Sequence, residues 1–220
     1  MNKDSFIWWD WVGRHTTQIQ SATFEHLRLT LIAVAVGFAI SLVLSAVALR
    51  YRWTFTPIAG FAGLLYTIPS LALFAFLVPI TGFNTLTSEI GLVSYTLAIF
   101  IRNIVAGVDS VPPDVVNAAD GMGYRPIRRF VTVDMPLAAP AIVAALRIAM
   151  VTTVGLVTVT GLIGQGGYGA FIDSGLSRNF STEIVVGGGL SVIMAIALDT
   201  LLVGVERIAT PWTRARKRFA

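Results

Sequence analysis

Few side chains in this sequence have the chemistry of a catalytic or metal-binding site. The 220 residues include no Cys, which excludes disulfides, thiolate metal ligands and cysteine nucleophiles. The two histidines, His15 and His26, are too few to suggest a zinc centre. The pattern G-x-x-x-x-G-K-[ST] of a phosphate-binding loop is also absent. We therefore expect no catalytic residues, and no metal or cofactor bound by this chain.

The notable polar side chains are charges within long apolar stretches. Arg102 and Asp199 each lie about six or seven residues from the same predicted end of their stretches, at a depth of about 10 Å. Charges at such depth are costly and usually face protein or water. We expect Arg102, with the adjacent Asn103, to share a polar network with Asp199. Arg147, slightly deeper, is the alternative partner of Asp199, and snorkelling is the alternative for Arg102.

The elements that hold these charges are apolar enough to cross a membrane. Hydrophobic residues make up 55% of the chain and charged residues 13%, about half the share in a soluble domain. Leu29–Leu49 is free of charges and covers about 30 Å as a helix, the thickness of a hydrocarbon core. We predict an all-α integral membrane protein with a kink at Pro69 and a turn containing Pro79 and Gly82. Its five transmembrane helices are expected at about 27–49, 57–78, 90–108, 137–160 and 184–205.

The distribution of Lys and Arg predicts the orientation. One alternating set of loops and termini holds ten of these residues and the opposite set holds four. The positive-inside rule then places the C-terminus in the cytoplasm and the N-terminus outside. The basic tail 207–220 is expected to contact anionic lipid rather than nucleic acid. The Trp-rich segment 1–22 is expected to lie in the headgroup region, a frayed tail being the alternative.

The loop 109–136, predicted to be cytoplasmic, contains signals for two short helices. Ser110 or Asp109 is a candidate cap for the first helix, and Gly123 is placed to end it. Pro126 is placed to start the second helix, which Pro136 is expected to close. Such a pair of helices is a docking surface, or else a rigid connector without a partner.

The same loop resembles the EAA loop of ABC importer permeases. That pattern is E-A-A, three residues, G, nine residues and then I-x-L-P. This sequence has Asn117-Ala118-Ala119, Gly123 and 133–136 at those offsets, with Asn117 in place of Glu. The segments 67–74, 102–107 and 162–169 are similar to the osmoprotectant branch of these permeases. That branch imports glycine betaine, choline, carnitine, proline betaine or related solutes.

The resemblance implies a type I ABC importer permease fold in the bacterial cytoplasmic membrane. It implies two permease subunits, identical or homologous, around one path, and an extracytoplasmic substrate-binding protein. Two separate ATP-binding subunits would hold ATP and Mg²⁺ and dock on the cytoplasmic loop, so this chain is a transport subunit rather than an enzyme. A permease for another small solute and an ion-coupled carrier are the alternatives. The implied coupling residues are Asn117, Ala118, Ala119, Asp120, Gly123, Tyr124, Arg125 and Pro136.

Small residues indicate close helix contacts. They recur every fourth residue at 33–45 and again at 187–199, which allows helix backbones to approach closely. Packing within the subunit is the default, and the second stripe could instead face the dimer axis. The glycine-rich loop 161–182 is expected to form a re-entrant or gate-closing turn, or to contact the binding protein. The candidate path or gate residues are Pro69, Ser70, Gly164, Gly166, Gly167, Gly187 and Ser191.

Overall fold

The computed structural model describes residues 7–210, and every regular element in this range is helical. Four helices are long and apolar enough to cross a membrane, and the bent pair α3–α4 is a fifth crossing if it is counted as one span. A short helix, α7, and a π-helical turn, η2, precede α8. The elements are α1 (Trp9–Arg14), α2 (Thr16–Arg50), η1 (Arg52–Thr54), α3 (Phe55–Thr67), α4 (Ser70–Thr81), α5 (Thr85–Asp109), α6 (Pro113–Gly121), α7 (Pro126–Arg129), η2 (Phe130–Asp134), α8 (Met135–Thr160), η3 (Gly161–Ile163), α9 (Tyr168–Arg178) and α10 (Ser181–Ala209).

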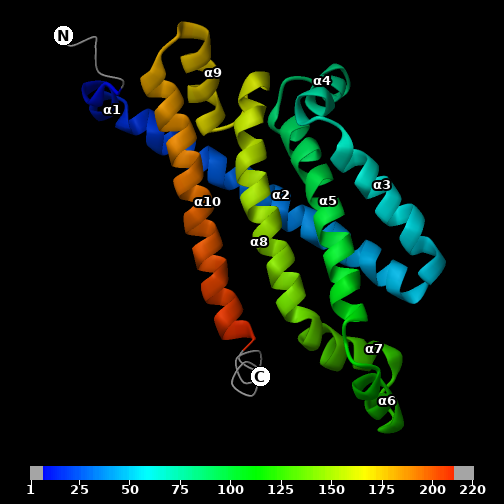
Figure 1. The fold of residues 1–220 in the computed structure, drawn as a ribbon. Helices are drawn as coiled ribbons and strands as arrows, with labels where there is room; N and C mark the ends of the chain where they lie inside the picture. The colour runs from blue at the N-terminus through cyan, green and yellow to red at the C-terminus, as the bar shows by residue number, and fades with distance from the viewer. Residues whose placement is uncertain (1–6, 211–220) are drawn as a thin grey trace.

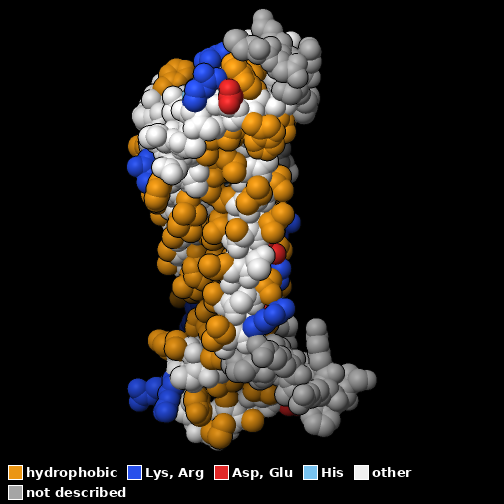
Figure 2. Space-filling model, turned by 90° about the vertical axis from the view of Figure 1, so that its left-hand side faces the viewer, with side chains coloured by type: hydrophobic (Ala, Val, Ile, Leu, Met, Phe, Trp, Pro, Cys, Tyr) orange, Lys and Arg blue, Asp and Glu red, His pale blue; other side chains and the backbone are white. Residues whose placement is uncertain are grey.

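The long helices run between two ends of the molecule. Figure 1 places α1, α4 and α9 at one end, and α6, α7 and the C-terminal end of α10 at the other. Figure 2 shows hydrophobic side chains over much of the middle of one face, with charged side chains near both ends and a few along one edge of the middle. This distribution suits a protein whose middle lies in hydrocarbon and whose ends lie in the headgroup regions.

Helix α5 is the centre of the packing. It contacts α2, α3, α4 and α8, and its Leu92, Phe100 and Ile101 are fully buried. Gly37 of α2 faces it so closely that a Cβ there would lie 1.8 Å from Oγ1 of Thr96. The small-residue stripe 33–45 is buried at all four of its positions. The interpretation that this first stripe packs within the subunit is therefore confirmed.

The prediction of one kinked helix over 57–78 is wrong. Helix α3 ends at Thr67, α4 begins at Ser70, and the two are bent by 97°. Ile68 has an extended backbone, as expected for a residue before proline. The Tyr95 hydroxyl of α5 donates to the carbonyl of Ile68, which has no helical partner at the break. Tertiary contact thus stabilises a full break rather than a kink.

Several predicted boundaries also differ from the structure. Pro79 lies inside α4, and only Gly82, at φ +82°, belongs to the turn after it. Helix α2 begins at Thr16, so the end of the predicted headgroup segment 1–22 falls inside a continuous helix. The spans expected at 90–108, 137–160 and 184–205 correspond to α5, α8 and α10, and each helix extends beyond at least one predicted end. Most of the tail 207–220 lies outside the described residues, and residues 207–209 still belong to α10.

Candidate functional site

The first short helix of the loop 109–136 starts without the predicted cap. Ser110 Oγ donates to the carbonyl of Gly107 at 2.7 Å, and Asp109 accepts two bonds from Arg52 at 3.0 and 2.7 Å. Within residues 7–210 no side chain caps α6, whose start is set by Pro112 and Pro113. The cap prediction is wrong because Asp109 instead ties the end of α5 to the turn after α2.

The predicted stop at Gly123 is confirmed. Gly123 has φ +79°, and the N–H groups that follow α6 turn back onto its last carbonyls. Gly123 donates to Asp120 at 2.9 Å and Tyr124 donates to Ala119 at 3.2 Å, which is a Schellman ending. A Cβ at Gly123 would meet nothing within 4 Å, so the requirement for glycine is conformational.

The loop presents a largely exposed surface. Of the implied coupling residues on α6 only Ala119 is buried, at 2% exposure, whereas Asn117, Ala118 and Asp120 are exposed. Tyr124 is half-buried with the guanidinium of Arg128 5.0 Å from its ring centre, and Arg125 is exposed. Apolar Met122 and Ile127 are also exposed, at 71% and 81%. Sequence reasoning did not select these two, although apolar residues at the end of one helix and the start of the next were a usable signal.

Pro136 does not close the second short helix as predicted. Helix α7, the π-helical turn and α8 form one continuous helical stretch over Pro126–Ile163. Pro136 lies in the first turn of α8, where its missing N–H costs little. The π-helical turn changes the register immediately before the proline, so the chain continues without a loop.

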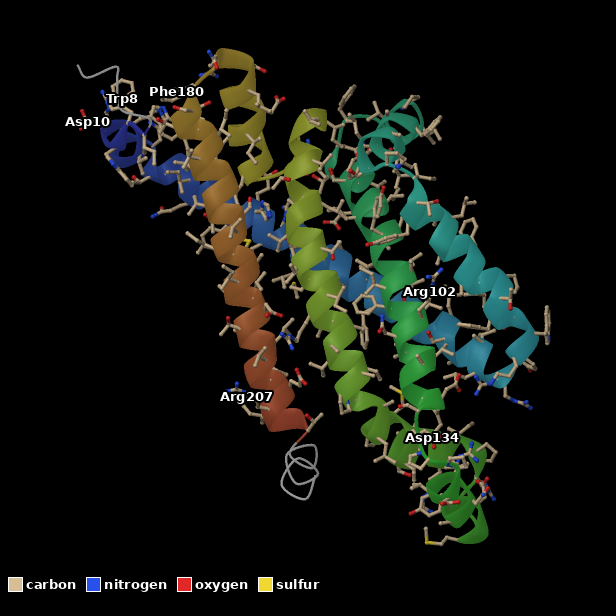
Figure 3. The ribbon with its side chains drawn as sticks, in the orientation of Figure 1. Trp8, Asp10, Arg102, Asp134, Phe180 and Arg207 are labelled. Atoms are coloured by element: carbon tan, nitrogen blue, oxygen red, sulfur yellow. The ribbon has the colours of Figure 1, made fainter. Side chains whose placement is uncertain are left out.

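The intramembrane charges pair differently from the expected Arg102–Asp199 contact. Arg147 of α8 donates to both oxygens of Asp199 on α10, at 2.8 and 3.1 Å, and to Glu206 at 3.3 Å. Arg102 faces α3, where a Cβ at Gly63 would lie 2.9 Å from its Nη2 (Figure 3). Asn103 donates to the carbonyl of Ile99 in its own helix. The named alternative partner, Arg147, is therefore the correct one, and Glu206 was missed.

The predicted Arg102–Asp199 contact is wrong because the prediction used depth in the membrane and not which helices lie side by side. Helix α8 contacts both α5 and α10, and the arginine that reaches Asp199 is on α8 and not on α5. Equal depth predicts equal distance from the membrane surface and says nothing about adjacency. The Arg147–Asp199 pair borders a hollow between α8 and α10, which is also lined by Ala144, Ile148, Val151 and Thr152.

The glycine-rich loop packs against the membrane helices of its own subunit. Gly164, Gly166 and Gly167 all have positive φ. A Cβ at Gly167 would lie 2.6 Å from His26 Cβ in α2, and one at Gly166 would lie 2.1 Å from Thr160 Oγ1. These glycines therefore allow the backbone to approach two helices closely.

The first two positions of the stripe in α10, Gly187 and Ser191, pack within their own subunit. A Cβ at Gly187 would lie 2.8 Å from the carbonyl of Tyr168 in α9, and buried Ser191 donates to the carbonyl of Gly187 at 2.8 Å. The packing interpretation accounts for these two positions. Pro69 and Ser70 lie elsewhere, at the break between α3 and α4.

Comparison with known proteins identifies the class. Residues 33–214 match the family described as the inner membrane component of binding-protein-dependent transport systems, and the chain belongs to this family. It is the permease subunit of an ABC importer and an inner-membrane protein. The solved MetNI methionine ABC transporter, in an inward-facing conformation, contains a chain with the same fold. The TM-score is 0.82 and the identity 19%, over 90% of this chain and 98% of that one.

Two permeases with higher sequence identity than the MetNI chain indicate the branch of the family. The osmoprotectant import permease protein OsmW of Salmonella typhimurium is 33% identical over 198 residues, which cover 88% of this chain and 92% of OsmW. The choline transport system permease protein OpuBB of Bacillus subtilis is 33% identical over 190 residues, which cover 86% of this chain and 87% of OpuBB. The resemblance to the osmoprotectant branch of ABC importer permeases is therefore confirmed.

Proposed function

We propose that this permease imports compatible solutes such as glycine betaine, choline, carnitine or proline betaine. The observation that carries the proposal is its similarity, over most of both chains, to permeases named for osmoprotectant and choline transport. Relatives named for carnitine, and for glycine betaine, carnitine and choline together, support the same solute class.

The proposed assembly contains two copies of the permease fold, identical or homologous, and an extracytoplasmic binding protein. Two separate ATP-binding subunits hold ATP and Mg²⁺ and dock on α6 and α7, whose exposed apolar and basic side chains suit a protein partner. The proposed topology has five crossings, with the N-terminus outside and the C-terminus in the cytoplasm. The excess of Lys and Arg at the end that holds α6 and α7 supports this orientation.

We also propose that the hollow between α8 and α10 faces the translocation path. Arg147, Asp199 and Glu206 each keep about a third of their side-chain surface exposed there. Hydrocarbon disfavours such charges, so the hollow suits water or a second permease subunit better than lipid. The break at Pro69 and Ser70 and the turn at Gly164, Gly166 and Gly167 remain candidate moving parts of the path.

Uptake of radiolabelled solutes tests the solute class. Cells that lack the gene are compared with cells complemented by the wild-type gene, at low and high osmolarity, for glycine betaine, choline and carnitine. We expect complementation to restore uptake of at least one of the three. Uptake that is independent of the gene for all three would overturn the solute class.

A second solute is favoured by one relative. The ergothioneine transport permease/ergothioneine binding protein EgtU of Helicobacter pylori is 36% identical over 143 residues, which are 65% of this chain and 25% of that longer protein. Radiolabelled ergothioneine in the same uptake assay distinguishes the candidates. Gene-dependent ergothioneine uptake, without uptake of the other three solutes, would favour this alternative.

A further inference from the structure

Arg129 lies between two carboxylates that belong to different parts of the cytoplasmic loop. Its Nη1 donates to both oxygens of Asp120 on α6, at 2.9 and 2.7 Å, and its Nε donates to Oδ2 of Asp134 at 3.3 Å. Asp134 ends the π-helical turn and directly precedes α8. Figure 3 shows Asp134 at the junction between the lower end of α8 and the α6–α7 pair. One arginine therefore connects α6 to the base of α8.

The two carboxylates are unequal. The Asp120 side chain is 49% exposed and accepts two hydrogen bonds from Nη1, whereas the Asp134 side chain is 6% exposed and accepts one longer bond from Nε. The second oxygen of Asp134, Oδ1, is buried and accepts no hydrogen bond from the described residues. An unpaired buried carboxylate oxygen is costly. The buried carboxylate thus competes with the exposed one for the same guanidinium.

Helix α6 is packed less extensively against the rest of the chain than the base of α8, the other element that Arg129 contacts. Helix α6 has nine residues, and Ala119 is the one buried residue in it. The base of α8 packs tightly on α5, since a Cβ at Gly107 would lie 2.9 Å from the Cβ of Ala141. A force on the loop would displace α6 before it displaced the base of α8.

We propose that Arg129 is a positioning residue that transmits the displacement of α6 to α8 by exchanging carboxylate partners. In the present arrangement it binds mainly Asp120. When α6 moves away, Arg129 turns to Asp134 and supplies the hydrogen bond that Oδ1 lacks. Two discrete pairings give the loop two positions, which is what a coupling element requires. The inference rests on the proposed docking of ATP-binding subunits at this loop.

The test uses the complete transporter in liposomes, with ATP hydrolysis and solute uptake measured on the same preparation. In Asp120→Asn the carboxylate on α6 is lost and Asp134 captures Arg129. We expect ATP hydrolysis to continue while uptake per ATP falls about fivefold or more, the lower range of energetic coupling between sites. Asp10→Asn is the matched control, because it makes the same charge change at an exposed position of α1, at the end of the molecule opposite to α6. Its uptake per ATP is expected to equal that of the wild type.

A conservative variant separates this role from folding or docking. Asp120→Glu keeps a carboxylate within reach of Arg129 and is expected to recover most of the uptake per ATP. An unchanged ratio in Asp120→Asn, or a parallel fall of uptake and hydrolysis, would overturn the partner exchange and leave the proposed function standing. A wild-type complex that hydrolyses ATP without solute uptake would instead overturn the proposed function and the exchange with it.

Discussion

Single residues decide how the buried backbone and the intramembrane charges are satisfied. Gly123 ends α6 through its positive φ, and Arg147 neutralises Asp199 across a helix interface. The role of Gly123 depends on the freedom of its backbone, and the role of Arg147 depends on which helix lies alongside α8. Each role can therefore be tested by comparing a substitution at that site with the same kind of substitution at a control site.

Gly123→Val is expected to disrupt the ending of α6, because a β-branched residue at positive φ costs about 2 kcal/mol. Gly121→Val places the same side chain two residues earlier, in helical backbone and open space, and is expected to be nearly neutral. The measurement is the amount of ATP-binding subunit that copurifies with the tagged permease. Equal amounts with the two variants would show that the conformation of Gly123 does not matter for docking.

Asp199→Asn is expected to lower the thermal stability of the detergent-solubilised permease, because it leaves Arg147 with Glu206 as its remaining carboxylate partner within the described chain. Arg102→Gln removes a charge that faces α3 and is expected to have a smaller effect. Melting is followed by size-exclusion chromatography after heating. A larger loss in Arg102→Gln than in Asp199→Asn would contradict the pairing.

The bounds of some helices follow from their own sequence, whereas the bounds of others depend on contacts with neighbouring helices. The long apolar helices α5, α8 and α10 correspond to apolar stretches that end at charges, prolines or glycines. The stretch predicted as the second crossing does not, because α3 has 13 residues and covers only about 20 Å of the roughly 30 Å core. Its break at Pro69 depends on α5, whose Tyr95 reaches the freed carbonyl of Ile68.

Tyr95→Phe is expected to destabilise the α3–α4 break by about 1 kcal/mol, because it leaves a partly buried carbonyl without its hydrogen-bond donor. Tyr66→Phe is the control, because Tyr66 contacts Tyr95 through its ring and is 43% exposed. Thermal unfolding in detergent compares the two variants. Similar melting temperatures for both would exclude the Tyr95 hydroxyl as the group that stabilises the break.

The end of the molecule that holds α6 and α7 has the excess of Lys and Arg, and the orientation proposed from this excess can be tested by labelling. The chain contains no Cys, so a single introduced thiol reports one position without a background. Ser177 on α9 and Met122 after α6 are both exposed and lie toward opposite ends.

In intact cells a membrane-impermeant maleimide is expected to label Ser177→Cys and to spare Met122→Cys. Permeabilised cells, in which both positions are labelled, control for thiol reactivity. Labelling of Met122→Cys in intact cells would reverse the proposed orientation.

The sequence by itself determined the membrane class, the approximate positions of four crossings and the helix stop at Gly123. These features follow from local properties, namely apolar length, the placement of charges and the backbone freedom of glycine. The resemblance in the loop 109–136 also required only the order of residues. Each of these could be predicted because no distant segment takes part.

Only the tertiary structure decided the partner of Asp199, the break at Pro69 and the position of the glycine-rich loop. The partner depends on α8 lying beside α10, and the break depends on a hydroxyl from α5. Gly167 is required by the proximity of His26, more than a hundred residues earlier in the chain. Depth and periodicity describe one helix at a time, whereas these contacts depend on which helices become neighbours when the chain packs.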